Sequence, residues 1–216
     1  MKYLVLFPFL LMSIFLKAQE DQIPFKAQQP PIPVEVMVGT KSGMYQMTIN
    51  KRFTADSKFK FFNLVNYEVD YEDQTPNKYI VQTIASYEFI KGFDVGAGAN
   101  LSAFGGFRPV VSTSYTRFTR AMGIIINPVY EIHKDGEFSV LARFEWHPVN
   151  DKKIQPYFSV QALTSWKDVH SFSYHNWRAG IQYKIFSFGP AVNFEYVGKN
   201  AEGTVNCGGF VNILIH

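Results

Sequence analysis

A short polar stretch over residues 167–175 carries the residue types of acyl-transfer chemistry. It supplies an acid, a hydroxyl and two imidazoles within a few positions: Asp168, His170, Ser171 and His175. A serine becomes nucleophilic when a neighbouring base takes its proton and a third group orients that base. These four residues are therefore the candidate catalytic set for a lipid hydrolase or acyltransferase. Loops are often polar without being catalytic, so the sequence as a whole favours a protein that is not an enzyme.

The remaining sequence offers no other motif for catalysis or metal binding. Gly96-Ala97-Gly98 has glycines like those of a phosphate loop, but no helical pattern follows it. Cys207 is the only cysteine and is expected to be a small strand residue, because it cannot form an intramolecular disulfide. No His-Glu-x-x-His motif and no cysteine pair occurs, so we expect neither a metal site nor a cofactor.

Extended strands are the elements that must position these residues. Apolar residues alternate with polar ones in Tyr45-Gln46-Met47-Thr48-Ile49-Asn50, and the same pattern recurs over 138–147 and 176–185. Such alternation gives a strand one apolar and one polar face. Turn residues fall at 54–57, 73–77, 91–92, 105–106, 134–136, 150–153 and 200–203. The segments between them have about 10 to 14 residues, the length of a tilted strand that crosses a bilayer.

The chemistry of the two faces indicates which one meets lipid. The polar faces are mostly Asn, Gln, Ser, Thr and Gly, which suit a confined and hydrogen-bonded lumen. The apolar faces have aromatic residues that we expect to form girdles at the membrane interfaces: Tyr87, Phe89, Phe144, Trp146, Trp166 and Trp177. A soluble periplasmic, lipocalin-like barrel that binds a ligand remains the alternative.

Composition supports a surface that water covers only in part. Aromatic residues make up 17% of the chain and charged residues 18%, whereas soluble domains carry about 25% charged residues. The net charge of +3 is small and its cations are scattered, which excludes nucleic acid as a partner.

The chain begins with the pattern of an export signal. Lys2 precedes an apolar run over residues 3–16, which is shorter than the roughly 20 residues of a membrane-spanning helix. We therefore expect residues 1–18 to be a cleaved signal peptide. A flexible lead rich in proline is expected over 19–33, followed by one barrel domain over 34–216.

The repeated strand pattern over residues 34–215 resembles the small porin-like outer-membrane β-barrel families. We expect an all-β fold, a transmembrane antiparallel up-and-down β-barrel of about twelve strands. Ten strands is the alternative, since the count depends on whether residues 41–43 form a hairpin. The resemblance implies an outer-membrane location, with membrane lipid and the barrel-assembly machinery as partners. The final residue, His216, departs from the terminal aromatic that is common in such families.

The polar faces also predict what fills the lumen. The expected lumen-lining charged residues are of both signs: Arg52, Glu68, Glu88, Glu131, Arg143, Glu145, Arg178, Lys184 and Glu195. Opposite charges in a narrow space pair with one another, so we expect a narrow or partly closed lumen. The predicted function is a narrow channel for a small solute, or a structural and interaction barrel.

The sidedness of the barrel follows from placing the end of the last strand in the periplasm. Residues 73–77, 105–106, 167–174 and 200–203 then become outer loops, and residues 54–57, 91–92 and 187–189 become periplasmic turns.

Overall fold

A computed structural model describes residues 29–72, 77–148 and 153–215. The expected signal peptide and most of the expected lead lie outside these residues. No helix among the described residues is long and apolar enough to span a membrane.

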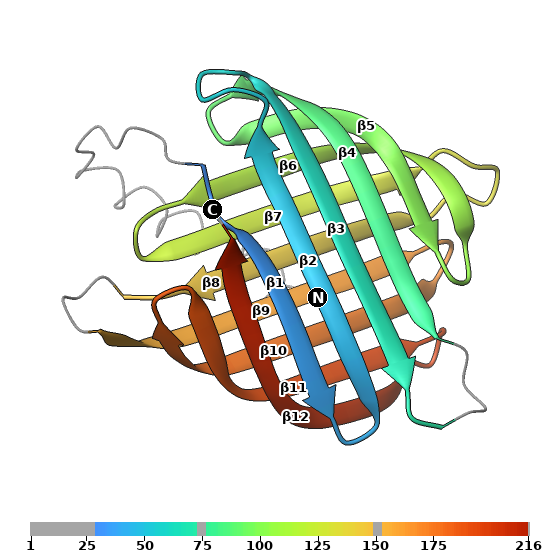
Figure 1. The fold of residues 1–216 in the computed structure, drawn as a ribbon. Coiled ribbons are helices and arrows are strands. Elements are labelled where there is room, and N and C mark those ends of the chain that lie inside the picture. Colours follow the sequence, from blue (N-terminus) through green and yellow to red (C-terminus); the bar gives the residue numbers. More distant parts are fainter. Residues whose placement is uncertain (1–28, 73–76, 149–152, 216) are drawn as a thin grey trace, which may run out of the picture.

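Twelve antiparallel strands close into one barrel (Figure 1). The prediction of an all-β up-and-down barrel of twelve strands is therefore confirmed. The strands are β1 Ile32–Gly39, β2 Ser42–Arg52, β3 Phe59–Asp70, β4 Lys78–Ile90, β5 Phe93–Ser102, β6 Gly106–Phe118, β7 Met122–Glu131, β8 Phe138–Trp146, β9 Ile154–Trp166, β10 His170–Tyr183, β11 Phe186–Val197 and β12 Glu202–Ile215.

Each strand pairs with its neighbours in the chain, and one long-range seam closes the barrel. In this seam β1 pairs with β12, from Ile32 opposite Ile215 to Gly39 opposite Gly208. Residues 40–41 connect β1 to β2, which resolves the strand count in favour of twelve. We call the end where β1 begins and β12 ends the terminal end, and the opposite end the distal end.

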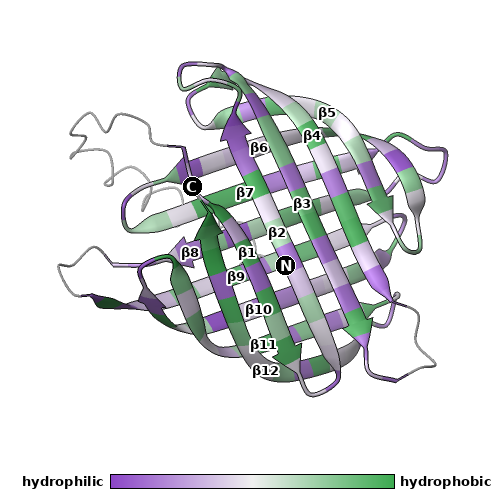
Figure 2. Ribbon diagram, viewed as in Figure 1, coloured by the Kyte–Doolittle hydropathy of each residue, from purple (hydrophilic) through white to green (hydrophobic). Residues whose placement is uncertain are grey.

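Alternate side chains point into the lumen and out of the barrel. Val36 and Val38 of β1 are 48% and 65% exposed, whereas Glu35 and Met37 are 6% and 0% exposed. Hydrophobic and hydrophilic residues alternate in this way along the strands (Figure 2). The outward residues are largely apolar, which is the arrangement expected of a barrel that faces lipid.

Part of the lumen is filled by apolar side chains. An apolar cluster from β3, β4 and β6 to β10 consists of Phe62, Leu64, Ile84, Val110, Val129, Leu141, Leu163 and Tyr174. These residues point inward, so the expectation of a mainly polar inner face holds for only part of the wall. Runs such as Phe61-Phe62 and Leu64-Val65 supply apolar residues to both faces of a strand.

Glycines allow β10 and β11 to approach each other closely. A Cβ atom on Gly180 would lie 2.1 Å from the Phe188 carbonyl oxygen, and one on Gly189 would lie 2.2 Å from the Ala179 carbonyl oxygen. No side chain fits between backbones this close. The two strands therefore need glycine at both positions.

Two local predictions are corrected by the strand boundaries. The predicted turn at 187–189 is wrong, because these residues lie inside β11 and the turn is at 184–185, where Lys184 adopts a left-handed φ of 55°. The predicted loop at 167–175 is too long. Only residues 167–169 connect β9 to β10, because the aromatic alternation of Phe172 and Tyr174 continues the strand.

Candidate functional site

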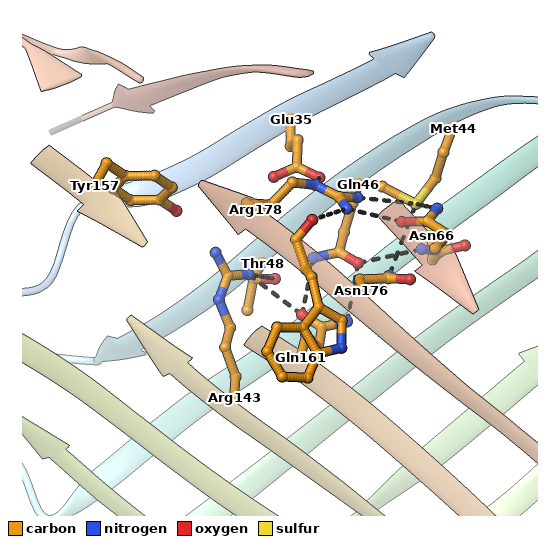
Figure 3. Close-up of polar contacts among 12 residues, drawn as sticks. Glu35, Met44, Gln46, Thr48, Asn66, Arg143, Tyr157, Gln161, Asn176 and Arg178 are labelled. Carbon is orange, nitrogen blue, oxygen red and sulfur yellow. Dashed lines mark hydrogen bonds and ion pairs between the residues drawn. The ribbon is translucent and has the colours of Figure 1, made fainter. Parts of the chain in front are cut away.

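Hydrogen bonds between side chains of distant strands close the middle of the lumen. Gln46 of β2 and Gln161 of β9 face each other and exchange two amide hydrogen bonds, each 2.9 Å from Nε2 to Oε1 (Figure 3). These strands are not neighbours in the barrel, so the bonds cross the interior. Asn66 and Tyr174 join the same amide pair from β3 and β10.

Two arginines extend this layer. Arg143 of β8 donates from Nη1 to Thr48 Oγ1 of β2 at 3.2 Å and from Nη2 to Glu145 Oε1 at 2.5 Å. Arg178 of β10 donates from Nε to Glu35 Oε1 of β1 at 2.8 Å. We call Glu35, Gln46, Thr48, Arg143, Gln161 and Arg178 the closing layer.

Burial makes the pairing of these charges necessary. The side chains of Arg178 and Glu35 are 2% and 8% exposed. Arg178 also donates from Nη1 to Asn193 Oδ1 at 2.7 Å. An unpaired charge in such a site would be strongly destabilising, while a paired one is tolerated. The closing layer thus combines two polar groups, the ion pair of Arg178 with Glu35 and the hydrogen-bonded set of Gln46, Thr48, Arg143 and Gln161.

A cavity of about 480 Å³ opens at the terminal end, below the closing layer. Thr48 and Arg143 belong to both, so the layer forms the floor of the cavity. Pro30 and Pro31 lie at its mouth, where the Gln29 side chain exchanges two hydrogen bonds with the backbone of Arg52. The wall also carries aromatic and ionisable groups: Lys60, Glu88, Tyr115, Glu145, His147 and Tyr157.

The charges around this cavity are paired. Lys60 Nζ lies 2.9 Å from Asp94 Oδ2 and 3.5 Å from Glu88 Oε1, and Arg52 forms an ion pair with Glu88. Glu145 accepts from Arg143 and from the Tyr157 hydroxyl. The cations that line the cavity nevertheless outnumber its carboxylates, with Arg52, Lys60, Lys91, Arg117 and Arg143 against Glu88 and Glu145. The cavity wall therefore favours negative over positive charge on a solute.

The distal end of the lumen holds a further charge pair. Lys78 of β4 reaches across to Glu195 of β11, with Nζ 2.7 Å from Oε1. Nearby, Ser42 donates to Glu68, and Asn100 donates to Glu131. Opposite charges in the lumen thus meet at both ends.

The structure places most of the predicted lumen residues on the inner face. Lys184 is the exception, because it lies in the turn at 184–185 with its Nζ 5.3 Å from the centre of the Tyr183 ring. The residues that point inward are Arg52, Glu68, Glu88, Glu131, Arg143, Glu145, Arg178 and Glu195.

Further charged residues line the lumen without having been predicted, among them Glu35, Lys60, Lys78 and Asp94. The signal for Glu35 was present, because Val34, Val36 and Val38 alternate around it. Lys60 was harder to find, since it lies among phenylalanines that occupy both faces of β3.

The candidate catalytic residues do not assemble as predicted. Ser171 donates to Glu137 Oε2 and to the Ser165 carbonyl oxygen, both at 3.1 Å, and Asp168 is exposed in the turn. His175 contacts the Tyr196 ring. His170 instead lies with Nε2 2.7 Å from Ser173 Oγ, a serine outside the predicted set.

The predicted girdle aromatics all point outward, and most lie near strand ends. They are between 37% and 50% exposed: Tyr87, Phe89, Phe144, Trp146, Trp166 and Trp177. Trp177 differs from the others because it lies in the middle of β10.

Comparisons with known proteins reveal similarity of architecture only. No protein-family model and no curated protein sequence matches the chain. Among solved structures, a KdgM porin is 16% identical with a TM-score of 0.46, over 86% of this chain and 99% of that one. A NanC porin is 11% identical with a TM-score of 0.48, over 87% and 99%. LpxR from Salmonella typhimurium is 6% identical with a TM-score of 0.41, over 84% and 99%. The chain thus resembles small porin-like outer-membrane barrels at low sequence identity.

Proposed function

We propose that the protein is an integral outer-membrane barrel that admits a small polar solute to its lumen, with the closing layer acting as a gate. The outward faces support the membrane location, because large apolar side chains are exposed around the whole barrel. A soluble barrel would place such residues in its core instead. The apolar exterior argues against the lipocalin-like alternative.

The observation that carries the proposal is the polar character of the closing layer. Buried ion pairs are no more stabilising than well-packed apolar residues of similar volume. A barrel that served only as a scaffold would gain more from filling its middle with apolar side chains. Here the middle holds two amide side chains and two arginines that can exchange their partners for water or for a solute.

The cavity limits the class of solute. Its volume of about 480 Å³ lies within the range of sites for small molecules. Ion pairs hold several of its charges, but the lining has more cations than carboxylates, so a polar solute that is neutral or negatively charged fits better than a cation. Tyr157 adds aromatic surface to the wall.

The terminal end, and with it the cavity, is placed on the periplasmic side. This orientation rests on the usual topology of outer-membrane barrels, in which both chain ends are periplasmic. It requires export through a cleaved signal peptide over residues 1–18, and insertion into lipid by the barrel-assembly machinery. Residues 77, 103–105, 167–169 and 198–201 then face the exterior.

Conductance in planar lipid bilayers tests the gate. The wild-type barrel should give small or infrequent conductance steps, because hydrogen bonds cross its lumen. The double variant Gln46→Ala/Gln161→Ala removes the central amide pair and should give larger, stable steps. Arg143→Ala should also alter the conductance, by shifting selectivity toward cations as Glu145 loses its partner.

Gln182→Ala is the matched control, because this glutamine lines the cavity and donates to the nearby Lys184 carbonyl oxygen, away from the closing layer. Its conductance should equal that of the wild type. If the wild type and the double variant are both silent while folded, the barrel is a closed scaffold, and solute passage is ruled out.

A further inference from the structure

The outer wall of the barrel carries a polar cluster over the distal halves of β9, β10 and β11, which consists of Thr164, His170, Ser173, His175 and Tyr196. Ser173 is the most buried of these side chains, at 5% exposed, and its Oγ lies 2.5 Å from Thr164 Oγ1. Ser173 pairs in register with Thr164 on one side and with Tyr196 on the other. The cluster is separate from the lumen, since Phe172 and Tyr174 on either side of Ser173 pack toward the apolar cluster inside.

A β-bulge brings the histidine and the serine to the same face. His170 and Ser173 are three residues apart, and a regular strand would point them to opposite faces. The register of β10 shifts between His170 and Phe172, so His170 pairs with the outward-facing Trp166. Bulges re-aim side chains in this way and are frequent next to active sites.

The hydrogen bonds of His170 assign a role to each ring nitrogen. Nδ1 lies 2.7 Å from the Gly198 carbonyl oxygen, which can only accept, so Nδ1 carries the proton. In the neutral ring Nε2 is then the acceptor, and it lies 2.7 Å from Ser173 Oγ. A nucleophile bonded to a base, with that base held by a third group, is the arrangement that activates a hydroxyl.

The position of the pair along the membrane normal indicates its substrate. Trp166, the last residue of β9, lies beside His170 and is 37% exposed on the outer wall. Tryptophans at strand ends mark the membrane interface. The carboxylic esters of membrane lipids lie at this depth, between the acyl chains and the headgroups.

We propose that Ser173 and His170 form a nucleophile and base that hydrolyse carboxylic esters of lipids in contact with the outer wall. Ser173 Oγ attacks the ester carbonyl carbon while its proton passes to His170 Nε2. The carbon–oxygen bond to the alcohol breaks, and the alkoxide takes that proton. Water then attacks the acyl carbon and passes a proton to Nε2. The bond between the acyl carbon and Ser173 Oγ breaks, which releases the carboxylic acid, and Nε2 returns its proton to Ser173 Oγ. The net reaction consumes one ester and one water.

Covalent labelling of the folded barrel tests this proposal. The refolded full chain, in phospholipid vesicles, is treated with a fluorescent long-chain alkyl fluorophosphonate, which bonds to serines activated by a base. Ser173 should be labelled, and Ser173→Ala should abolish the label. Hydrolysis of a fluorogenic phospholipid ester in the same vesicles should follow the labelling.

Histidine variants separate catalysis from structure. His170→Ala should slow labelling about 100-fold or more, the scale of base catalysis. Added imidazole should restore part of the rate, which a purely structural role would not allow. Ser171→Ala is the matched control, because Ser171 bonds Glu137 and should leave labelling unchanged.

Migration on unheated gels checks that each variant is folded. The proposal is overturned if the folded wild type takes no more label than Ser173→Ala. It is equally overturned if folded His170→Ala is labelled at the wild-type rate. Neither result depends on whether the lumen conducts.

Discussion

The lumen is filled in two different ways. The apolar cluster, represented by Leu64 and Ile84, packs without polar partners, whereas the closing layer joins Gln46, Gln161 and Arg178 through directional hydrogen bonds. Apolar burial is non-directional and strongly stabilising, while a buried polar group mainly regains the hydrogen bonds it has lost from water. The apolar cluster therefore contributes more to the stability of the barrel, and the closing layer is the part that the proposed gate would open.

The largest expected effect comes from breaking the buried ion pair. Arg178→Ala leaves the Glu35 carboxylate buried without its partner and should lower the free energy of unfolding by about 3–5 kcal/mol. Urea unfolding in phospholipid vesicles measures the change. The double variant Glu35→Leu/Arg178→Met should recover most of it, because apolar residues can replace a buried pair. If the double variant is as unstable as Arg178→Ala, apolar packing cannot replace the buried ion pair, which contradicts the comparison of the two fillings.

Leu64→Ala tests the apolar cluster. This side chain is 1% exposed, and its truncation should cost about 2–5 kcal/mol in the same unfolding measurement. Conductance should not change, because the closing layer is intact. Val65→Ala on the outer face is the matched control and should cost less, since lipid fills the space. An open channel in Leu64→Ala would show that the apolar cluster also gates the lumen.

Gln161→Ala tests the amide pair by itself. It removes both bonds to Gln46 and should cost about 1–3 kcal/mol, because the Gln46 amide is left short of partners. Conductance should nevertheless rise, the reverse of the result for Leu64→Ala. Equal conductance in Gln161→Ala and Leu64→Ala would show that the closing layer and the apolar cluster do not differ in how they block the lumen.

The smallest effect is expected at the distal charge pair. The side chains of Lys78 and Glu195 are 29% and 16% exposed, so solvent screens their attraction. Lys78→Ala should change the free energy of unfolding by about 1 kcal/mol or less, and high salt should reduce the difference further. A loss as large as that of Arg178→Ala would mean that exposure does not control the strength of these pairs.

The architecture could be predicted from the sequence because the alternation of apolar and polar residues shows which side chains share a face of each strand. Phe144 and Trp146 point outward and Arg143 and Glu145 point inward, as their alternation predicted. The one uncertainty in the strand count was whether residues 41–43 form a hairpin, and the connection at 40–41 resolves it. What the alternation could not reveal was the apolar cluster, because runs such as Phe61-Phe62 place apolar residues on both faces at once.

The sites were less predictable because they depend on which strands face each other. The pairing of Gln46 with Gln161 joins residues 115 positions apart, and no local pattern encodes it. The contact between His170 and Ser173 depends on a bulge that reverses the alternation of β10 at one position. The sequence prediction instead treated residues 167–175 as one loop and selected Ser171 from it, without the strand and bulge that bring Ser173 to His170.

The seam between β1 and β12 has a consequence for the order of assembly. Every other strand pair joins neighbours in the chain and can form as a local hairpin, whereas Ile32 meets Ile215 only after the whole chain is present. Closing so long a loop carries the largest entropic penalty of any pairing in the barrel. The open intermediate exposes two strand edges, and such edges pair readily with other chains. The protein is thus most prone to aggregation just before β1 and β12 pair. A chaperone that shields these two strand edges from other chains would act at that step.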